Sequence, residues 1–248
     1  MTDGLIIREY NGVGEADRFI TALTRERGVI RAAARGARRI KSRAGAATQL
    51  LCYSRLRLIT GRDAYIVEDA QPIELFFGLR DDIEKMALGQ YFCELAAAVC
   101  PTDEPAQDSL RLLLSALHYL AENARPLPLL KATVEWRLLS CAGYMPNIAA
   151  CARCGKSTAD MRFSAAEGTV YCSDCDRGST LPLTAGALSA IRHVTAGPLE
   201  KCFAFTLAPA ALQLFSEAAE LFVKTQLQRS FKTLDFFHTL HKTGVEHP

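Results

Sequence analysis

Short runs of apolar residues alternate with polar residues over the first third of the chain. Five segments there are rich in β-branched and aromatic residues, and Gly, Asn or Asp residues separate them. In the fourth segment Leu56 and Leu58 would lie on one face of a strand and Arg55 and Arg57 on the other, which is the period of a half-buried strand. The predicted strands cover residues 4–10, 17–24, 28–35, 48–60 and 64–70.

Five strands in roughly 70 residues leave no room for the helices that would connect parallel strands. The pattern therefore favours a small five-stranded antiparallel barrel of the oligonucleotide-binding (OB) type over a doubly wound sheet. An SH3-like barrel is the alternative that the pattern leaves open.

Apolar residues recur at intervals of three and four after Pro72, which is typical of helices. We expect Asp108 or Ser109 to cap the second helical segment. Gly143 and Pro146 mark the end of the third, because Gly suits a left-handed cap and Pro cannot continue the helix. The predicted helical segments cover residues 79–100, 108–124, 127–144, 183–197 and 208–237.

The length of 248 residues is long for one domain and short for three. Hydrophobic residues make up 49% of the chain and charged residues 23%, which is ordinary for a protein with a buried core and excludes general disorder. We therefore predict an α+β protein with an OB-fold domain over residues 1–80 and an α-helical domain over residues 81–248. Residues 147–178 show neither pattern and form a predicted insert in the second domain.

No stretch approaches the roughly 20 consecutive apolar residues of a membrane span, and the first residues lack the pattern of a secretion signal. We expect a soluble cytoplasmic protein without a membrane partner. The nine cysteines are an odd number in a large chain, so reduced thiols or metal ligation fit better than a disulfide framework.

Four of the cysteines have metal-ligand spacing. Two residues separate Cys151 from Cys154 and Cys172 from Cys175, and seventeen residues lie between the two pairs. Two residues between thiolates let one turn present both sulfurs to one tetrahedral ion, so the two pairs can complete a four-sulfur shell. We predict a structural Zn²⁺, because a full shell leaves no open position for water or substrate. Four unligated thiols or a redox pair are the alternatives.

Positive charge is concentrated near the N-terminus. Residues 1–80 hold 14 Lys and Arg against 9 Asp and Glu, whereas the remaining 168 residues hold 15 against 18. Glu26 is the lone acidic residue in a segment of nineteen with eight cations, which predicts phosphate contacts that are salt-sensitive and largely independent of base sequence. These candidate DNA-binding residues are Arg25, Arg27, Arg31, Arg35, Arg38, Arg39, Lys41 and Arg43.

Other readings of this basic segment stay open. It can be a solvated face, or it can meet a membrane or an acidic protein. Tyr53 and Tyr65 are candidates for stacking on bases, and both can equally be core residues.

Catalytic motifs are missing from the sequence. It contains no Walker loop, Rossmann fingerprint, nucleophile elbow or paired carboxylate motif. A zinc deaminase needs a Glu two positions after a His or Cys ligand, and no His or Cys here has one. We therefore expect no enzymatic activity. The five other cysteines are expected to be buried, inert thiols: Cys52, Cys93, Cys100, Cys141 and Cys202.

Several motifs together resemble the bacterial RecO recombination mediators. The resemblance spans nearly the whole chain and implies an OB-fold N-terminal domain, an α-helical C-terminal domain and a zinc module. The motifs are GLIIREY at 4–10, TRERG at 24–28, ARGARRIKS at 34–42, EWRLLSCAGYMP at 135–146 and LQRSFKTLDFF at 227–237.

The resemblance also implies a function in DNA repair and recombination. Proteins of that family bind single- and double-stranded DNA, anneal complementary strands without ATP, and act with RecR to load RecA onto strands coated by single-strand-binding protein (SSB). RecF is a further candidate partner, and the nucleoid is the implied location in the cytoplasm. The family's basic surface matches Arg35, Arg38, Arg39, Lys41 and Arg43 best, and its zinc-bearing members match the four paired cysteines.

The resemblance further implies that the helical domain contacts the acidic, hydrophobic C-terminal tail of SSB. Arg137 is one candidate cation for that contact, with a helix surface charge or an internal ion pair as the alternative. The competing class of protein is an RNA-binding module of transcription or translation, which can also combine a small barrel with a zinc ribbon.

Overall fold

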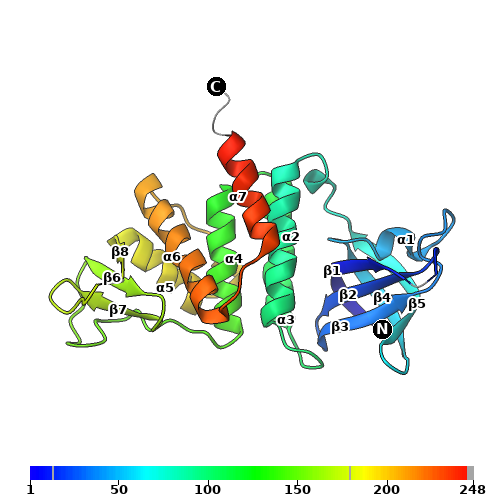
Figure 1. Cartoon of the computed structure of the whole chain (residues 1–248), viewed down its shortest axis with the longest axis horizontal. Coiled ribbons are helices and arrows are strands. Elements are labelled where there is room, and N and C mark those ends of the chain that lie inside the picture. The colour runs from blue at the N-terminus through cyan, green and yellow to red at the C-terminus, as the bar shows by residue number, and fades with distance from the viewer. Residues whose placement is uncertain (13, 179, 245–248) are drawn as a thin grey trace. The chain divides into compact units, whose positions relative to one another are not determined.

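A computed structural model describes residues 1–12, 14–178 and 180–244 (Figure 1). The strands are β1 (Thr2–Asn11), β2 (Arg18–Thr24), β3 (Gly28–Ala34), β4 (Tyr53–Thr60), β5 (Tyr65–Glu74), β6 (Met161–Ser164), β7 (Thr169–Cys172) and β8 (Leu181–Leu183). The helices are α1 (Ala44–Ala47), α2 (Ile83–Val99), α3 (Gln107–Ala121), α4 (Leu127–Cys141), α5 (Ala185–Ala196), α6 (Pro209–Leu227) and α7 (Lys232–Gly244). Two 3-10 turns are η1 (Phe77–Leu79) and η2 (Leu199–Lys201).

The contacts divide the chain into two compact units. The first unit comprises Met1–Ala124 and Phe231–Pro248, and the second comprises Arg125–Ser230. This division places α2, α3 and α7 in the same unit as the barrel. It follows contacts in the structure, whereas the domains at 1–80 and 81–248 were predicted from sequence pattern and stay predictions. Among the described residues, no helix combines the length and the apolar character that crossing a bilayer requires.

The first five strands form a closed barrel in the order β1-β2-β3-β5-β4. Neighbouring strands are antiparallel, except that β3 and β5 pair in parallel at Ala32 and Tyr65. This order is that of an OB barrel rather than an SH3-like one, and it confirms the predicted fold class.

Aliphatic side chains of different sizes fill the narrow interior of the barrel. Ile6, Ile20 and Leu56 are buried there together with several alanines, such as Ala22 and Ala32. A break in the β1–β2 register between Ile6 and Arg8 interrupts the alternation of β1. The part of β1 beyond Ile7 is progressively exposed, so the last residues of this strand lie on the outside of the barrel.

The start of α3 differs from the prediction. The helix begins at Gln107 with Ala106 in the cap position, so the expectation that Asp108 or Ser109 caps it was wrong. The physical reason is tertiary: the N–H of Ala106 donates to the carbonyl of Arg25 at 3.0 Å, which fixes the chain at a point two residues before Asp108. Asp108 instead lies in the first turn, where its charge favours the helix N-terminus.

The last predicted helical segment is two helices. Gln228 has a φ of 49°, in the left-handed region, and it ends α6 before α7 begins. Helix α7 then packs along α2, although the two are far apart in the sequence (Figure 1). The Thr233 hydroxyl donates to Glu94 at 2.6 Å, and His241 pairs with Glu84.

The second unit combines α4, α5 and α6 with a three-stranded sheet in the order β7-β6-β8. The sheet extends past residue 178, where the predicted insert ends, because β8 pairs with β6. Trp136 of α4 stacks on Phe222 of α6, with ring centroids 5.1 Å apart, and meets Phe163 of β6 edge-on at 5.5 Å. This aromatic cluster fixes the small sheet to the helices.

Candidate nucleic-acid interface and metal centre

All eight predicted DNA-binding residues are exposed on the first unit. Arg25 and Arg27 lie in the turn between β2 and β3, and Arg31 points outward from the middle of β3. The other five belong to the segment between β3 and α1, residues 35–43, which we call the basic loop. The cations therefore lie along one continuous segment of the chain, from the β2–β3 turn through β3 to the start of α1.

The main chain of the basic loop is tied to the barrel. The N–H of Gly36 donates to the Asp17 carboxylate at 2.8 Å, and the N–H of Arg38 donates to the carbonyl of Ala16 at 3.0 Å. Ala37 is buried with the barrel core, and Gly36 adopts a φ of 64° at the turn that leads to it. The loop is thus held at its base while its charged side chains reach solvent.

A groove of about 540 Å³ lies on the outside of the barrel, where α2 and the α2–α3 connection also line it, and Arg31 is among its lining residues. The β-sheet register explains part of its lining, because Arg8 of β1 faces Thr21 of β2, which in turn faces Arg31 of β3. Arg62, in the β4–β5 turn, adds a third cation. The residues of this barrel groove that bear charges or rings are Arg8, Tyr10, Arg31, Arg62, Asp63, Tyr65 and Asp103.

Tyr65 lies in the barrel groove and interacts with Arg27. The Arg27 guanidinium donates to the Tyr65 hydroxyl at 2.6 Å, and its central carbon lies 5.5 Å from the centroid of the ring. The parallel pairing of Ala32 with Tyr65 brings the two residues together. Tyr53, the other predicted stacking candidate, lies half-buried on β4 opposite Leu5 of β1.

Close backbone packing supports the β2–β3 turn. Gly28 has a φ of 54°, and a Cβ at this position would lie 2.1 Å from the carbonyl oxygen of Pro101. Next to it, the N–H of Val29 donates to that same oxygen at 2.8 Å. The α2–α3 connection therefore braces the strand that carries Arg31, and only glycine fits at this approach.

Sequence reasoning missed several residues of the interface. Arg8, Tyr10 and Arg62 line the barrel groove, and Phe19 is 39% exposed opposite Tyr10 on β2. They stand singly in the chain, so no local charge cluster marks them. The available signal was the polar and aromatic end of the first strand, in which Arg8 and Tyr10 follow three apolar residues.

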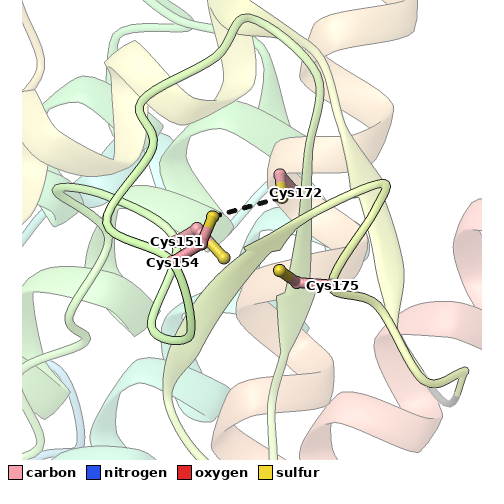
Figure 2. A group of neighbouring side chains, drawn as sticks. All are labelled: Cys151, Cys154, Cys172 and Cys175. Atoms are coloured by element: carbon pink, nitrogen blue, oxygen red, sulfur yellow. Dashed lines mark hydrogen bonds between the residues drawn. The ribbon is translucent and has the colours of Figure 1, made fainter.

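The four paired cysteines converge near the open end of the β6–β7 hairpin, where Cys172 ends β7 (Figure 2). Their sulfur atoms lie within 4.8 Å of one another, and the sulfurs of Cys154 and Cys172 are 3.7 Å apart. A tetrahedral shell with metal–sulfur distances of about 2.3 Å places its sulfurs roughly 3.8 Å apart. The donor set and its geometry therefore fit one metal ion.

Each cysteine pair sits in its own tight turn. The N–H of Gly155 donates to the carbonyl of Cys151 at 2.9 Å, and Gly155 takes the left-handed conformation with a φ of 72°. The N–H of Cys175 donates to the carbonyl of Cys172 at 3.0 Å, directly after β7 ends. These turns point both sulfurs of each pair toward the same centre.

Crowding of the four sulfurs gives two of the thiols very different pKa values. Burial opposes ionisation of Cys151, but N–H donation from Cys172, Cys154 and Arg153 outweighs it and lowers the pKa of that thiol to about 6. Burial and the neighbouring cysteines raise the pKa of Cys175 to about 12. One thiolate thus inhibits formation of the next, and a bound cation would remove that penalty.

The cysteines outside this cluster have other surroundings. Burial raises the pKa of Cys93 to about 12 and that of Cys202 to about 11, as expected of inert thiols. Cys52 is also buried, whereas Cys100 is half-buried. Cys141 is exposed, so the expectation of burial was wrong there. It is the last residue of α4, where the helix leaves the packed core.

Arg137, the candidate cation for an SSB contact, caps a helix. Its Nη1 donates to the carbonyls of Val194, Thr195 and Gly197 at 2.9 to 3.0 Å. These are carbonyls at the C-terminal end of α5, where a cation is favoured by the helix dipole. The guanidinium therefore has a structural task within the second unit.

The fold and the two sites define a class: OB-barrel proteins with a helical part and a four-cysteine metal-site module. Family models agree with this description. The model for the N-terminal part of recombination protein O matches residues 1–76, and the model for its C-terminal part matches residues 80–235.

Whole-chain relatives point the same way. The chain is 35% identical over 246 residues to the DNA repair protein RecO of Acetivibrio thermocellus, with 97% of each chain covered. It is 35% identical over 245 residues to that of Symbiobacterium thermophilum, with 96% of each covered. It is 34% identical over 232 residues to that of Anaeromyxobacter sp. strain K, with 91% of each covered. The chain belongs to the RecO family of DNA repair proteins.

Proposed function

We propose that this protein mediates recombinational DNA repair by binding single- and double-stranded DNA on its barrel and annealing complementary strands. The observation that carries the proposal is the set of exposed cations along β3 and the basic loop, together with the cations Arg8, Arg31 and Arg62 that line the barrel groove. Arginines at phosphates give affinity without base readout, and aromatic rings in a groove stack on bases of any sequence. Family membership supports DNA as the nucleic acid.

Annealing follows from where the charges lie. Two strands repel each other through their phosphates, and a protein that neutralises both backbones lowers that repulsion. Flexible arginine side chains on the basic loop leave base edges free to pair, whereas base-specific contacts would compete with pairing. The proposed reaction needs no ATP, because strand pairing itself is downhill.

Protein partners belong to the same proposal. RecR is the proposed partner for loading RecA onto strands coated by SSB, with RecF as a further candidate, and the C-terminal tail of SSB is the proposed contact of the helical part. Since Arg137 is engaged by the end of α5, no residue is assigned to that tail. We propose the cytoplasm, at the nucleoid, as its location, because the proposed role is on chromosomal DNA.

The proposed metal is Zn²⁺, held by Cys151, Cys154, Cys172 and Cys175. An all-thiolate tetrahedral shell is typical of structural zinc, with iron as the other metal that such a shell holds. Zinc would fix the two turns to each other, and a shell of four protein ligands has no position for a reacting water. We accordingly propose that the protein acts by binding and catalyses no bond making or breaking.

The test is annealing of complementary single strands coated with the cognate SSB, measured without ATP. Annealing by the wild-type protein that is lost when Arg38 and Arg39 are both replaced by Glu supports the proposal. Absence of annealing together with tight RNA binding would overturn it in favour of an RNA-binding module.

A further inference from the structure

Ile40 stands fully in solvent at the tip of the basic loop. Its relative exposure of 105% is the largest among the exposed large hydrophobic residues of the described chain. Arg39 precedes it and Lys41 follows it, both exposed. Among the residues that the structure describes, no contact accounts for an apolar side chain at this position.

Backbone hydrogen bonds fix the conformation of the loop on both sides of Ile40. The N–H of Arg39 donates to the carbonyl of Gly36 at 3.1 Å, and the N–H of Ser42 donates to the carbonyl of Arg39 at 2.9 Å. Further along, the Arg18 guanidinium donates to the carbonyl of Gly45 at 3.0 Å. The loop is a series of tight turns clamped at both ends, so it presents Ile40 in one place.

An isolated apolar side chain between cations matches one feature of nucleic acids. A base step is an apolar slot between two anionic backbones, and proteins that deform DNA place Ile, Leu, Met or Phe into such slots. A lipid surface offers the same combination of charges and apolar groups, but one isoleucine buries too little apolar area to hold a protein on a membrane. The barrel groove, which lies in the same unit and contains Tyr10 and Tyr65, also favours bases as the occupant.

We propose that Ile40 is a wedge that inserts between neighbouring bases of the bound DNA and unstacks them, while Arg39 and Lys41 contact the flanking phosphates. This inference rests on the proposed DNA binding and adds a mechanical role to it. Unstacking destabilises short mispaired stretches. Two strands that pair out of register therefore dissociate sooner and can pair again in the correct register. The wedge thus speeds annealing of strands that fold on themselves more than annealing of unstructured strands.

The experiment uses the full-length protein and DNA that carries 2-aminopurine, whose fluorescence rises when the base is unstacked. The variants are Ile40→Ser and a matched control, Ile83→Ser. Ile83 is also well exposed, at 63%, but acidic residues Asp82 and Glu84 flank it instead of cations. Binding is followed in parallel by anisotropy over a range of salt concentrations.

We expect wild type and Ile83→Ser to raise the fluorescence of bound DNA and Ile40→Ser to leave it unchanged. Binding by Ile40→Ser should weaken by about fivefold with the same salt dependence, since an apolar contact is lost and no charge is removed. Annealing of hairpin-forming strands should slow more than annealing of unstructured strands.

Three results would overturn the wedge. Equal fluorescence changes with wild type and Ile40→Ser would show that the bases unstack without it. A salt dependence altered by Ile40→Ser would mean that its loss disturbs the neighbouring cations. Loss of binding to anionic vesicles by Ile40→Ser, with DNA binding intact, would assign Ile40 to a membrane. Failure of the wild-type protein to bind DNA at all would instead contradict the proposed function itself.

Discussion

Arg27 and Tyr65 meet on the outside of the barrel through a hydrogen bond of 2.6 Å between guanidinium and hydroxyl. Thirty-eight residues separate them in the chain, and the parallel pairing of β3 with β5 joins them. The cation also lies 5.5 Å from the centre of the ring, within the range of a cation–π contact. A cation that orients an aromatic ring at the wall of a groove is an arrangement suited to stacking bases beside phosphates.

The first prediction concerns this ring. Tyr65→Ala should weaken binding to single-stranded DNA by about fivefold or more, because stacking of one base on an aromatic ring contributes about 1–3 kcal/mol. Tyr65→Phe keeps the ring and should bind nearly as wild type. Fluorescence anisotropy with labelled oligonucleotides of mixed sequence measures both. Equal losses in the two variants would assign the effect to the hydroxyl and its bond to Arg27, and would argue against stacking.

The second prediction concerns charge on the basic loop. Replacing Arg38 and Arg39 together by Glu should weaken DNA binding most at low salt, because fewer counterions are released from the DNA. The slope of log affinity against log salt on duplex DNA should fall by about two, one for each phosphate contact removed. Binding titrations at several salt concentrations give this slope.

The matched control for that prediction is the double replacement of Lys201 and Lys224 by Glu. Both lysines are exposed in the second unit, so the net charge changes by the same amount away from the barrel. The control should keep the wild-type slope. Equal changes in both double variants would mean that total charge alone governs binding.

The periodicity of the sequence was sufficient to predict the architecture. Strict alternation around Leu56 and helical spacing after Pro72 are local signals, and the elements they predict are present in the structure with shifts at their ends. The Cys-x-x-Cys pairs likewise predicted a cluster that the structure brings within 4.8 Å. Local patterns succeed where the side chains that act together are close in the chain.

Features that depend on tertiary contacts could not be predicted in this way. The cap of α3 is set by a bond from Ala106 to Arg25, and the barrel groove joins Arg8 with Arg62, which only strand pairing brings near. Arg137 resembles a surface cation in the sequence, but its guanidinium donates to a carbonyl at the end of α5. Each case depends on the register between distant elements, which a charge or hydropathy pattern does not contain.

The third prediction concerns the metal. Cys172→Ser should remove most of the bound metal, which elemental analysis of the wild-type protein should identify as zinc at one ion per chain. Without the ion the two turns are held only by weak hydrogen bonds, so the β6–β7 hairpin should loosen. Trp136, the single tryptophan, reports this change because Phe163 of β6 packs against it.

Cys141→Ser is the control for the metal prediction, since this exposed thiol lies outside the four-sulfur cluster. It should keep the full metal content and the wild-type fluorescence. DNA binding should persist in both variants, because the predicted DNA-binding residues belong to the other compact unit. Full metal content in Cys172→Ser would contradict the four-thiolate shell.

The fourth prediction concerns a buried ion pair in the second unit. The Lys131 ammonium lies 3.1 Å from Glu135 and 2.8 Å from Glu220, and the side chains of Lys131 and Glu135 are 3% and 0% exposed. Burial tends to lower the pKa of Lys131, but the two carboxylates outweigh it and raise that pKa. A raised pKa means that the charge stabilises the fold at neutral pH and that this contribution is lost only as alkaline pH passes the folded-state value.

Lys131→Met should therefore lower the free energy of unfolding by about 3–5 kcal/mol, because it removes the cation that lies against the buried carboxylate of Glu135. Lys131 stays charged in the wild type from pH 6 to pH 9, so the loss should not shrink as the pH rises through this range. Urea unfolding followed by the fluorescence of Trp136, which is fully buried in the same unit, measures it. The double variant Lys131→Met/Glu135→Leu should recover most of the stability, since the buried carboxylate is removed together with its cation. The exposed pair of Arg57 with Glu68, 3.7 Å apart, supplies the control: Arg57→Met should cost less than about 1 kcal/mol. If the double variant were as unstable as Lys131→Met, lost packing of the lysine chain would be the cause and the charge argument would be wrong.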